Sequence, residues 1–185
     1  MSFIIPTCPT GCESLVPEVD FDVCSPKISF GEIEHIYVAA GDAAAFTDVE
    51  DLSEWTTRIS EDGLDPDAIR DLHVMADLPA ATADEIVITL GRKIYSPATH
   101  IINVTIDDIS DENYEFARAT SCNTSYRVWF ATESHIYGGN DGILANINLR
   151  PVIETGQKSI NKLMGTVQWE HQFSPERHTN PFATV

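Results

Sequence analysis

Apolar side chains recur at every second position in several stretches of this chain, which is the pattern of a half-buried β-strand. The clearest example spans residues 163–173, where apolar and polar positions alternate. A first strand is predicted over residues 28–38, which are rich in β-branched and aromatic residues and place Ile33, His35 and Tyr37 on one face. One face of each strand is therefore expected to pack on a core.

Further strands are predicted from short β-branched runs that Gly, Pro or polar turn residues separate. They cover residues 69–75, 85–90, 92–95, 99–106, 125–132 and 143–153. The glycine-rich turn at residues 138–142 predicts that the strand before it and the strand after it are neighbours in one sheet. The turn spacing over residues 85–106 favours an antiparallel meander.

Two stretches have helical spacing instead. Leu52, Trp55 and Ile59 recur every three or four positions in the segment 47–59, behind an acidic first turn that complements the helix dipole. A second helix is predicted over residues 110–120, with a serine as its N-cap. The chain is therefore expected to be mainly β, an antiparallel β-sandwich or barrel with one or two short α-helices.

The length of 185 residues suffices for one domain with a sizeable core. Four prolines among residues 1–27 exclude regular helix and central strand there, which predicts an extended N-terminal arm. Apolar residues of this arm need burial, either on a neighbouring copy or on the core of the same chain. We expect a single β-rich domain over residues 28–174 and an extended C-terminal tail over residues 175–185.

The chain is strongly acidic, with 29 Asp and Glu against 11 Lys and Arg and a formal net charge of −18. Binding to nucleic acid by counterion release needs clustered Lys and Arg, and the sequence contains no such cluster. No stretch approaches the ~20 apolar residues that a membrane-spanning helix needs. These features argue against specific nucleic-acid binding and against a membrane location, and they predict a protein made in a cytoplasm.

Cys8, Cys12, Cys24 and Cys122 are the most suggestive candidate ligands, because four thiolates can bind one zinc ion tetrahedrally. Zinc knuckles usually have two residues between paired cysteines, whereas three separate Cys8 from Cys12. A reducing cytoplasm keeps cysteines as thiols. We therefore expect free thiols, with a metal site and a disulfide as the alternatives.

Two acidic clusters have the density of a metal or catalytic site. The first comprises Glu61, Asp62, Asp65, Asp67 and Asp71, and the second comprises Asp107, Asp108, Asp111 and Glu112. The first cluster lacks the ligand order and the central glycine of an EF-hand calcium loop, so we interpret it as a solvated turn. The second lies at a predicted helix start, where acids complement the dipole without any catalytic role.

No Gly-x-Ser-x-Gly, His-Glu-x-x-His, P-loop or dinucleotide-binding motif occurs in the sequence. The six histidines are far apart, at positions 35, 73, 100, 135, 171 and 178, and are expected to be surface or partly buried residues and not ligands. Trp55, Trp129 and Trp169 follow strand or helix periodicity, which predicts core packing. We therefore predict no enzyme activity, no cofactor, and no catalytic or metal-binding residues.

Three segments of the chain resemble virion structural proteins of tailed bacteriophages, particularly of the crAss-like gut phages. They are CSPKISFGEIEHIYV at residues 24–38, DLSEWTTRI at residues 51–59 and GGNDGI at residues 138–143. The resemblance implies a component of the tail, neck or head that works through copies of itself and through neighbouring virion proteins, without a cofactor.

The expected function is that of a virion structural protein that is assembled in the host cytoplasm into a homo-oligomeric ring or tube, at the tail or the head-tail junction. An acidic inner wall would suit such a tube, because it repels the phosphate backbone of passing DNA. A capsid decoration protein or a fibre-attachment binding module is the alternative, since an acidic surface also keeps an outer protein soluble.

Overall fold

The computed structural model describes residues 31–61, 65–88, 93–120, 122, 125–155 and 160–183. These residues form mainly antiparallel β-sheet with two short helices, as the sequence predicts. The predicted N-terminal arm, residues 1–27, lies outside the described residues.

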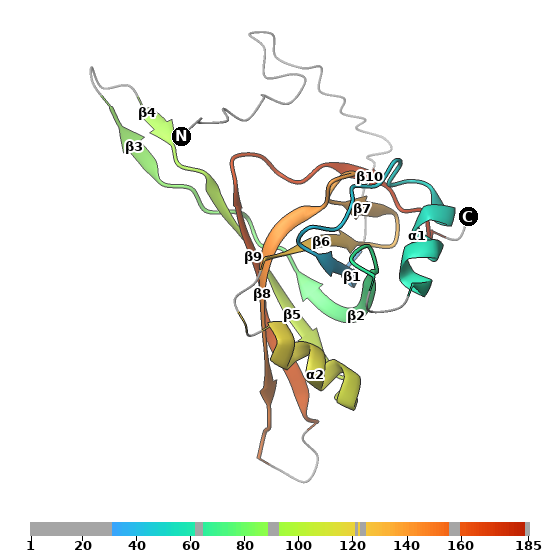
Figure 1. The fold of residues 1–185 in the computed structure, drawn as a ribbon. Coiled ribbons are helices and arrows are strands. Elements are labelled where there is room, and N and C mark those ends of the chain that lie inside the picture. Colours follow the sequence, from blue (N-terminus) through green and yellow to red (C-terminus); the bar gives the residue numbers. More distant parts are fainter. Residues whose placement is uncertain are drawn as a thin grey trace, which may run out of the picture.

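Six strands close into a barrel (Figure 1). In spatial order they are β1 (Ile33–Ala40), β2 (Arg70–Asp77), β5 (Ala98–Ile106), β9 (Lys162–His171), β8 (Ile143–Val152) and β6 (Ser125–Ala131). Each strand pairs antiparallel with the next, and β6 pairs with β1 to close the ring. The pairing of β6 with β8 confirms that the glycine-rich turn separates two neighbouring strands.

The barrel interior is filled by alternate residues of its strands. In β9, Leu163, Val167 and Trp169 point into this core, whereas Met164 and Gln168 are exposed. The predicted alternation is therefore confirmed over residues 163–169, whereas His171 at the end of β9 is exposed and Phe173 lies beyond the strand. Burial of Trp169 also confirms the core position predicted for that tryptophan.

Residues 36–39 of strand β1 are buried on both faces of the strand. Its pairing with β2 shifts register between Ile33 and His35, which turns Ile33 into the barrel interior together with Ile36 and Val38. Tyr37 points outward into a second core. The prediction that Ile33 shares a face with His35 and Tyr37 is wrong, because simple alternation does not survive a register irregularity.

The second core lies outside the barrel wall, under helix α1 (Leu52–Ser60). Trp55 of α1 and Trp129 of β6 are both fully buried there, as predicted for the two tryptophans. Asp51 is the N-cap and accepts a hydrogen bond from the Ser53 amide, so the helix lies within the segment where the apolar spacing predicts it. Leu52 was expected on the apolar face, but it is 45% exposed.

Helix α2 (Asp111–Thr120) packs on the barrel near β8 (Figure 1). Ala117 belongs to the interior core, and Phe116 packs against it. The Ser110 hydroxyl accepts a hydrogen bond from the Asn113 amide at 3.3 Å, which confirms the predicted N-cap.

Two three-residue strands extend the sheet beyond the barrel. They are β7 (His135–Tyr137), which pairs with β6, and β10 (Arg177–Thr179), which pairs with β7. Neither was predicted, because three residues are too short to show a period. Phe182 follows β10 and stacks on Tyr37. Residues 177–183, which were expected in an extended tail, thus pack on their own chain.

The strands β3 (Glu85–Val87) and β4 (Lys93–Tyr95) pair only with each other. Figure 1 shows that this β3–β4 hairpin projects away from the barrel. The predicted meander through residues 85–106 therefore does not form as one sheet: β5 pairs instead with β2 and β9. A single bridge between Thr82 and Thr99 lies at the base of the hairpin.

Candidate functional site

The projecting β3–β4 hairpin exposes four large apolar side chains together. Its cross-strand pair Ile86 and Ile94 is 44% and 47% exposed, and Val87 and Tyr95 are each 65% exposed. Among the described strands, β3 and β4 form a two-stranded sheet of their own, and an isolated two-stranded hairpin is marginally stable in water. The exposed side chains of this hairpin therefore need a partner surface.

The hairpin also differs from the rest of the chain in charge. Residues 85–95, from the start of β3 to the end of β4, contain Arg92, Lys93 and one acid, Glu85, so they carry a formal charge of +1. Lys93 forms an ion pair of 2.8 Å with Glu85. Because the whole chain carries −18, the remainder carries −18 − 1 = −19. A basic hairpin on an acidic body is electrostatically complementary to the body of a second copy.

A second exposed apolar end lies where β8 and β9 leave the barrel. Ile153 is 78% exposed and Ile160 is 67% exposed, and a Lys162–Glu154 ion pair of 3.2 Å lies beside them. Figure 1 places this end away from the β3–β4 hairpin. The subunit thus offers apolar surface at two separate places.

An open depression of about 660 Å³ lies between β1, β2 and β6. Ile33, Leu78 and Phe130 contribute its apolar lining, while Glu32 and Asp77 add carboxylates. This combination suits a segment that carries apolar and basic side chains.

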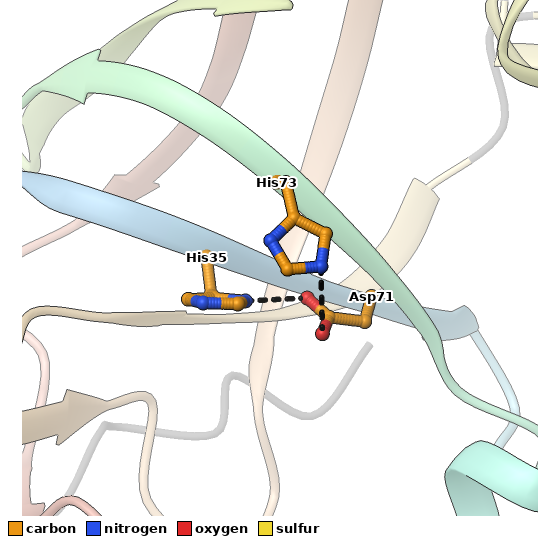
Figure 2. A group of neighbouring side chains, drawn as sticks. All are labelled: His35, Asp71 and His73. Atoms are coloured by element: carbon orange, nitrogen blue, oxygen red, sulfur yellow. Dashed lines mark hydrogen bonds and ion pairs between the residues drawn. The ribbon is translucent and has the colours of Figure 1, made fainter. Parts of the chain in front are cut away.

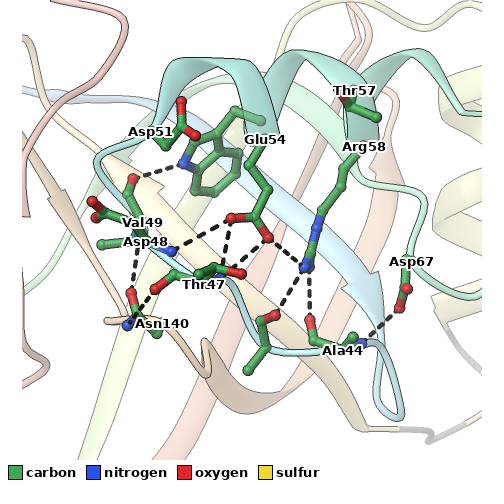
Figure 3. A network of polar contacts seen from close by, with 12 residues as sticks. Ala44, Thr47, Asp48, Val49, Asp51, Glu54, Thr57, Arg58, Asp67 and Asn140 are labelled. Carbon is green, nitrogen blue, oxygen red and sulfur yellow. Dashed lines mark hydrogen bonds and ion pairs between the residues drawn. The ribbon is translucent and has the colours of Figure 1, made fainter.

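The loop that leads into α1 is held by a polar network centred on Glu54 (Figure 3). The Glu54 carboxylate accepts hydrogen bonds from the backbone amides of Thr47 and Asp48, at 3.1 Å and 3.4 Å, and from Arg58 at 2.8 Å. The side-chain oxygen of Asn140 accepts from the Val49 amide at 2.9 Å and so ties this loop to the glycine-rich turn. The network therefore positions α1 on the barrel.

Arg58 is the charged side chain at the centre of this packing. Its guanidinium donates to the carbonyls of Ala44 and Ala45, at 2.7 Å and 2.8 Å, and lies 4.1 Å from the centre of the Phe46 ring. The residue is only 8% exposed. Because all these interactions are internal, we assign Arg58 to stability and not to ligand binding.

A cluster of His35, Asp71 and His73 lies on the outer faces of β1 and β2 (Figure 2). His35 Nδ1 is 2.9 Å from Asp71 Oδ1, and His73 Nε2 is 3.8 Å from Asp71 Oδ2. The His35 and His73 rings meet edge to face with centroids 4.4 Å apart. The carboxylate of Asp71 thus faces both imidazoles.

Exposure differs across this cluster. The side chains of His35 and Asp71 are 30% and 25% exposed, whereas that of His73 is 78% exposed. Tyr37 follows on the same face and stacks on His35 with ring centroids 5.9 Å apart. Burial, and secondarily the Asp71 carboxylate, raise the pKa of the Tyr37 phenol far above its ordinary value. The Tyr37 phenol is therefore uncharged and borders the cluster next to His35.

From the sequence, Asp71 is expected in a solvated acidic turn, and the histidines are expected far apart. The structure instead separates the members of that turn. Asp65 accepts from the Asp67 amide, and Asp67 accepts from the Ala44 amide, whereas Asp71 lies on β2 beside His35. The signal that could have found the cluster is the Asp-x-His spacing on a predicted strand, which places both side chains on one face.

Among the four cysteines, Cys122 lies within the described residues and is an exposed free thiol. Cys8, Cys12 and Cys24 lie outside the described residues. In the second acidic cluster, Asp108 accepts from the Ser110 amide at 3.0 Å, next to the start of α2. That contact is a local helix-start interaction.

No protein-family model, curated protein or solved structure matches this chain. Within the described ranges, neither helix is long and apolar enough to cross a membrane. A functional proposal for this chain therefore rests on its own geometry and chemistry.

Proposed function

We propose that this protein is a virion structural subunit of a tailed bacteriophage, and that copies of it assemble into a ring or tube at the tail or the head-tail junction. The observation that carries the proposal is the projecting β3–β4 hairpin with its exposed apolar side chains. The resemblance of residues 24–38, 51–59 and 138–143 to phage structural proteins supports the same conclusion.

The occupant that best suits the hairpin is a second copy of the chain. Fully burying an exposed aliphatic or aromatic side chain contributes about 1.5–3 kcal/mol, and the hairpin offers Ile86, Val87, Ile94 and Tyr95 together. Its +1 charge is attracted to a body that carries −19. Every further copy of the chain presents the same acidic body, so a second copy can serve as the partner of the hairpin.

The open depression between β1, β2 and β6 has the chemistry of an acceptor for this hairpin. Met75 and Leu78 offer exposed apolar contact, and Glu32 and Asp77 add negative charge that complements the positively charged hairpin. A hairpin that reaches from one subunit to the next is a heterologous contact, which generates a ring or a continuing helical tube. The acidic body of the subunit further suits a channel wall that repels DNA.

The decisive experiment compares the full chain with the double variant Ile86→Asp/Ile94→Asp. We expect the unchanged protein to form rings or tubes at high concentration, seen by negative-stain electron microscopy and sedimentation velocity, and the variant to remain monomeric. Both side chains lie outside the barrel, so the melting temperature of the variant should stay close to that of the unchanged monomer.

The matched control is Tyr114→Asp, which adds a charge at another exposed apolar position, 40% exposed on α2. This variant should assemble like the unchanged protein. A chain that stays monomeric at every accessible concentration, or a hairpin variant that assembles normally, would overturn the proposal.

A further inference from the structure

Assembly through the β3–β4 hairpin leaves the cluster of His35, Asp71 and His73 without a role. In the described part of the chain, these residues form a group whose potential ligand atoms all lie within 4.8 Å of one another. We propose that they bind one divalent transition-metal ion of the Zn²⁺, Ni²⁺ and Cu²⁺ class. The ligand atoms would be Nδ1 of His35, a carboxylate oxygen of Asp71 and Nε2 of His73.

The distances in the cluster match those between ligands on one ion. Two ligands bound tetrahedrally to Zn²⁺ at about 2.0–2.1 Å are roughly 3.3 Å apart. The Nδ1–Oδ1 distance of 2.9 Å and the Nε2–Oδ2 distance of 3.8 Å lie on either side of that value. The two distances involve different oxygens of the Asp71 carboxylate, and the three ligand atoms lie within 4.8 Å of one another, so binding of one ion requires them to draw closer together by rotation of the side chains.

The backbone holds the three ligands in place before any ion binds. His35 and His73 are directly paired across β1 and β2, and Asp71 lies two residues along β2 on the same face. Directly opposed residues of an antiparallel pair have Cβ atoms about 4.5–5.5 Å apart. Both strands belong to the closed barrel, so the site is built on rigid elements and not on a loop.

The ligand types select the class of ion. Two imidazoles with one carboxylate suit Zn²⁺, Ni²⁺ and Cu²⁺, whereas Ca²⁺ and Mg²⁺ prefer sites made of oxygen ligands. Three protein ligands leave a coordination position for water or for a further ligand. The 78% exposure of the His73 side chain places that position toward solvent.

The surroundings favour a cation. A shallow depression of about 400 Å³ beside the two imidazoles is also lined by Glu34, Asp107 and Asp108. These carboxylates make the local potential negative, in a chain that is already strongly acidic. They also offer acceptors for water molecules bound to the ion.

The competing explanation is a simple hydrogen bond between His35 and Asp71, with His73 as an exposed neighbour. The two explanations differ in what they require of His73. A hydrogen-bonded pair does not need this imidazole, since its Nε2 is 3.8 Å from the carboxylate, which is too long for a hydrogen bond. A metal site needs it as a ligand.

Isothermal titration with Zn²⁺ tests the proposal on the full chain with serine at all four cysteine positions, which removes competing thiolates. We expect saturable binding of one ion per chain. His73→Ala and Asp71→Asn should each weaken the Zn²⁺ affinity by more than about tenfold, the loss that even outer-shell changes produce at metal sites. Mg²⁺ should not compete.

The matched control is His178→Ala, because His178 also lies 3.8 Å from two carboxylates, those of Glu50 and Glu176, but belongs to no compact group of three ligands in the part of the chain that the structure describes. This variant should bind Zn²⁺ like its parent. His73 is largely exposed, so His73→Ala should fold normally and report on binding alone. Unaltered affinity in His73→Ala and Asp71→Asn, or no saturable binding by the parent, would overturn the proposal.

Imidazole nitrogen NMR of the unsubstituted chain gives an independent readout. Zn²⁺ should shift the nitrogens of His35 and His73 and leave those of His178 unchanged. Shifts confined to other histidines would contradict the assignment. A negative result here would not affect the assembly proposal, because the hairpin experiment measures oligomeric state without added metal.

Discussion

The indole rings of Trp55 and Trp129 meet edge to face with their centroids 5.6 Å apart. Trp55 comes from α1, and Trp129 comes from the outer face of β6. Each indole N–H donates to a backbone carbonyl at 2.8 Å, Trp55 to Val49 and Trp129 to Gly139. The pair therefore joins the helix, the loop before it and the glycine-rich turn to the barrel wall.

Replacing Trp55 by alanine should remove the centre of this outer core. We expect a loss of about 3–5 kcal/mol in the free energy of unfolding, because the side chain is fully buried and no neighbour can fill its volume. Urea denaturation measures this. Leu52→Ala on the same helix is the control and should cost less than about 1 kcal/mol, since Leu52 is 45% exposed. Equal losses in the two variants would show that α1 does not form the second core.

Arg58→Met tests the polar network around Glu54. The variant keeps an aliphatic side chain but removes the donor for Glu54 and for the carbonyls of Ala44 and Ala45. We expect the free energy of unfolding to fall by about 2–3 kcal/mol, because partly buried acceptors are left unpaired. Arg118→Met is the control: its ion pair with Glu115 is exposed, so the change should stay within about 0.5 kcal/mol. A stability loss no larger than that of the control would argue against the network.

Gly165→Ala tests how closely β9 approaches β8. A Cβ atom at position 165 would collide with the backbone carbonyl oxygen of Asn148, and backbone cannot move aside as a flexible side chain can. Overpacking of this kind costs about 1–3 kcal/mol or more. Gly31→Ala is the control, because the nearest atom to its added Cβ would be a Thr132 carbon at 3.3 Å. Thermal melting of both variants should show a large decrease for the first and a small one for the second.

The strands that the sequence predicts well bury one face and expose the other. β9 is the clearest case, because Leu163, Val167 and Trp169 are buried while the residues between them are intermediate or exposed. β1 departs from this pattern since the barrel core covers one face and α1 covers the other. Its register shift at Ile33 then changes which residues share a face, and no local pattern encodes that shift.

The candidate metal ligands show the same limit. Asp71 and His73 lie two residues apart on a predicted strand, so their common face follows from the sequence. His35 also lies on a predicted strand, but its direct pairing with His73 depends on β1 and β2 being neighbours in one register. Register is a property of the assembled sheet, and it is invisible in either strand alone. The buried role of Arg58 is hidden for a similar reason, because Phe46 and the carbonyls that surround it come from a separate loop.

The assembly proposal makes a specific prediction about charge. Arg92→Glu/Lys93→Glu changes the formal charge of residues 85–95 from +1 to −3 and that of the whole chain from −18 to −22. If the hairpin docks on the acidic body of a second copy, this variant should assemble far less well than the unchanged protein at low ionic strength. Raising the ionic strength from about 0.1 M to about 1 M should weaken assembly of the unchanged protein and narrow the difference, because the Debye length falls from about 10 Å to about 3 Å.

The control for this charge reversal is Arg118→Glu/Arg177→Glu, which gives the same net charge of −22 with both changes outside the hairpin. Both arginines are exposed, on α2 and on β10. Sedimentation velocity at matched concentrations should show the control assembling nearly as well as the unchanged protein, because total charge acts on assembly less strongly than charge at the contact. If the two double variants lose assembly equally, the hairpin is not the contact, and general repulsion between acidic subunits explains the effect instead.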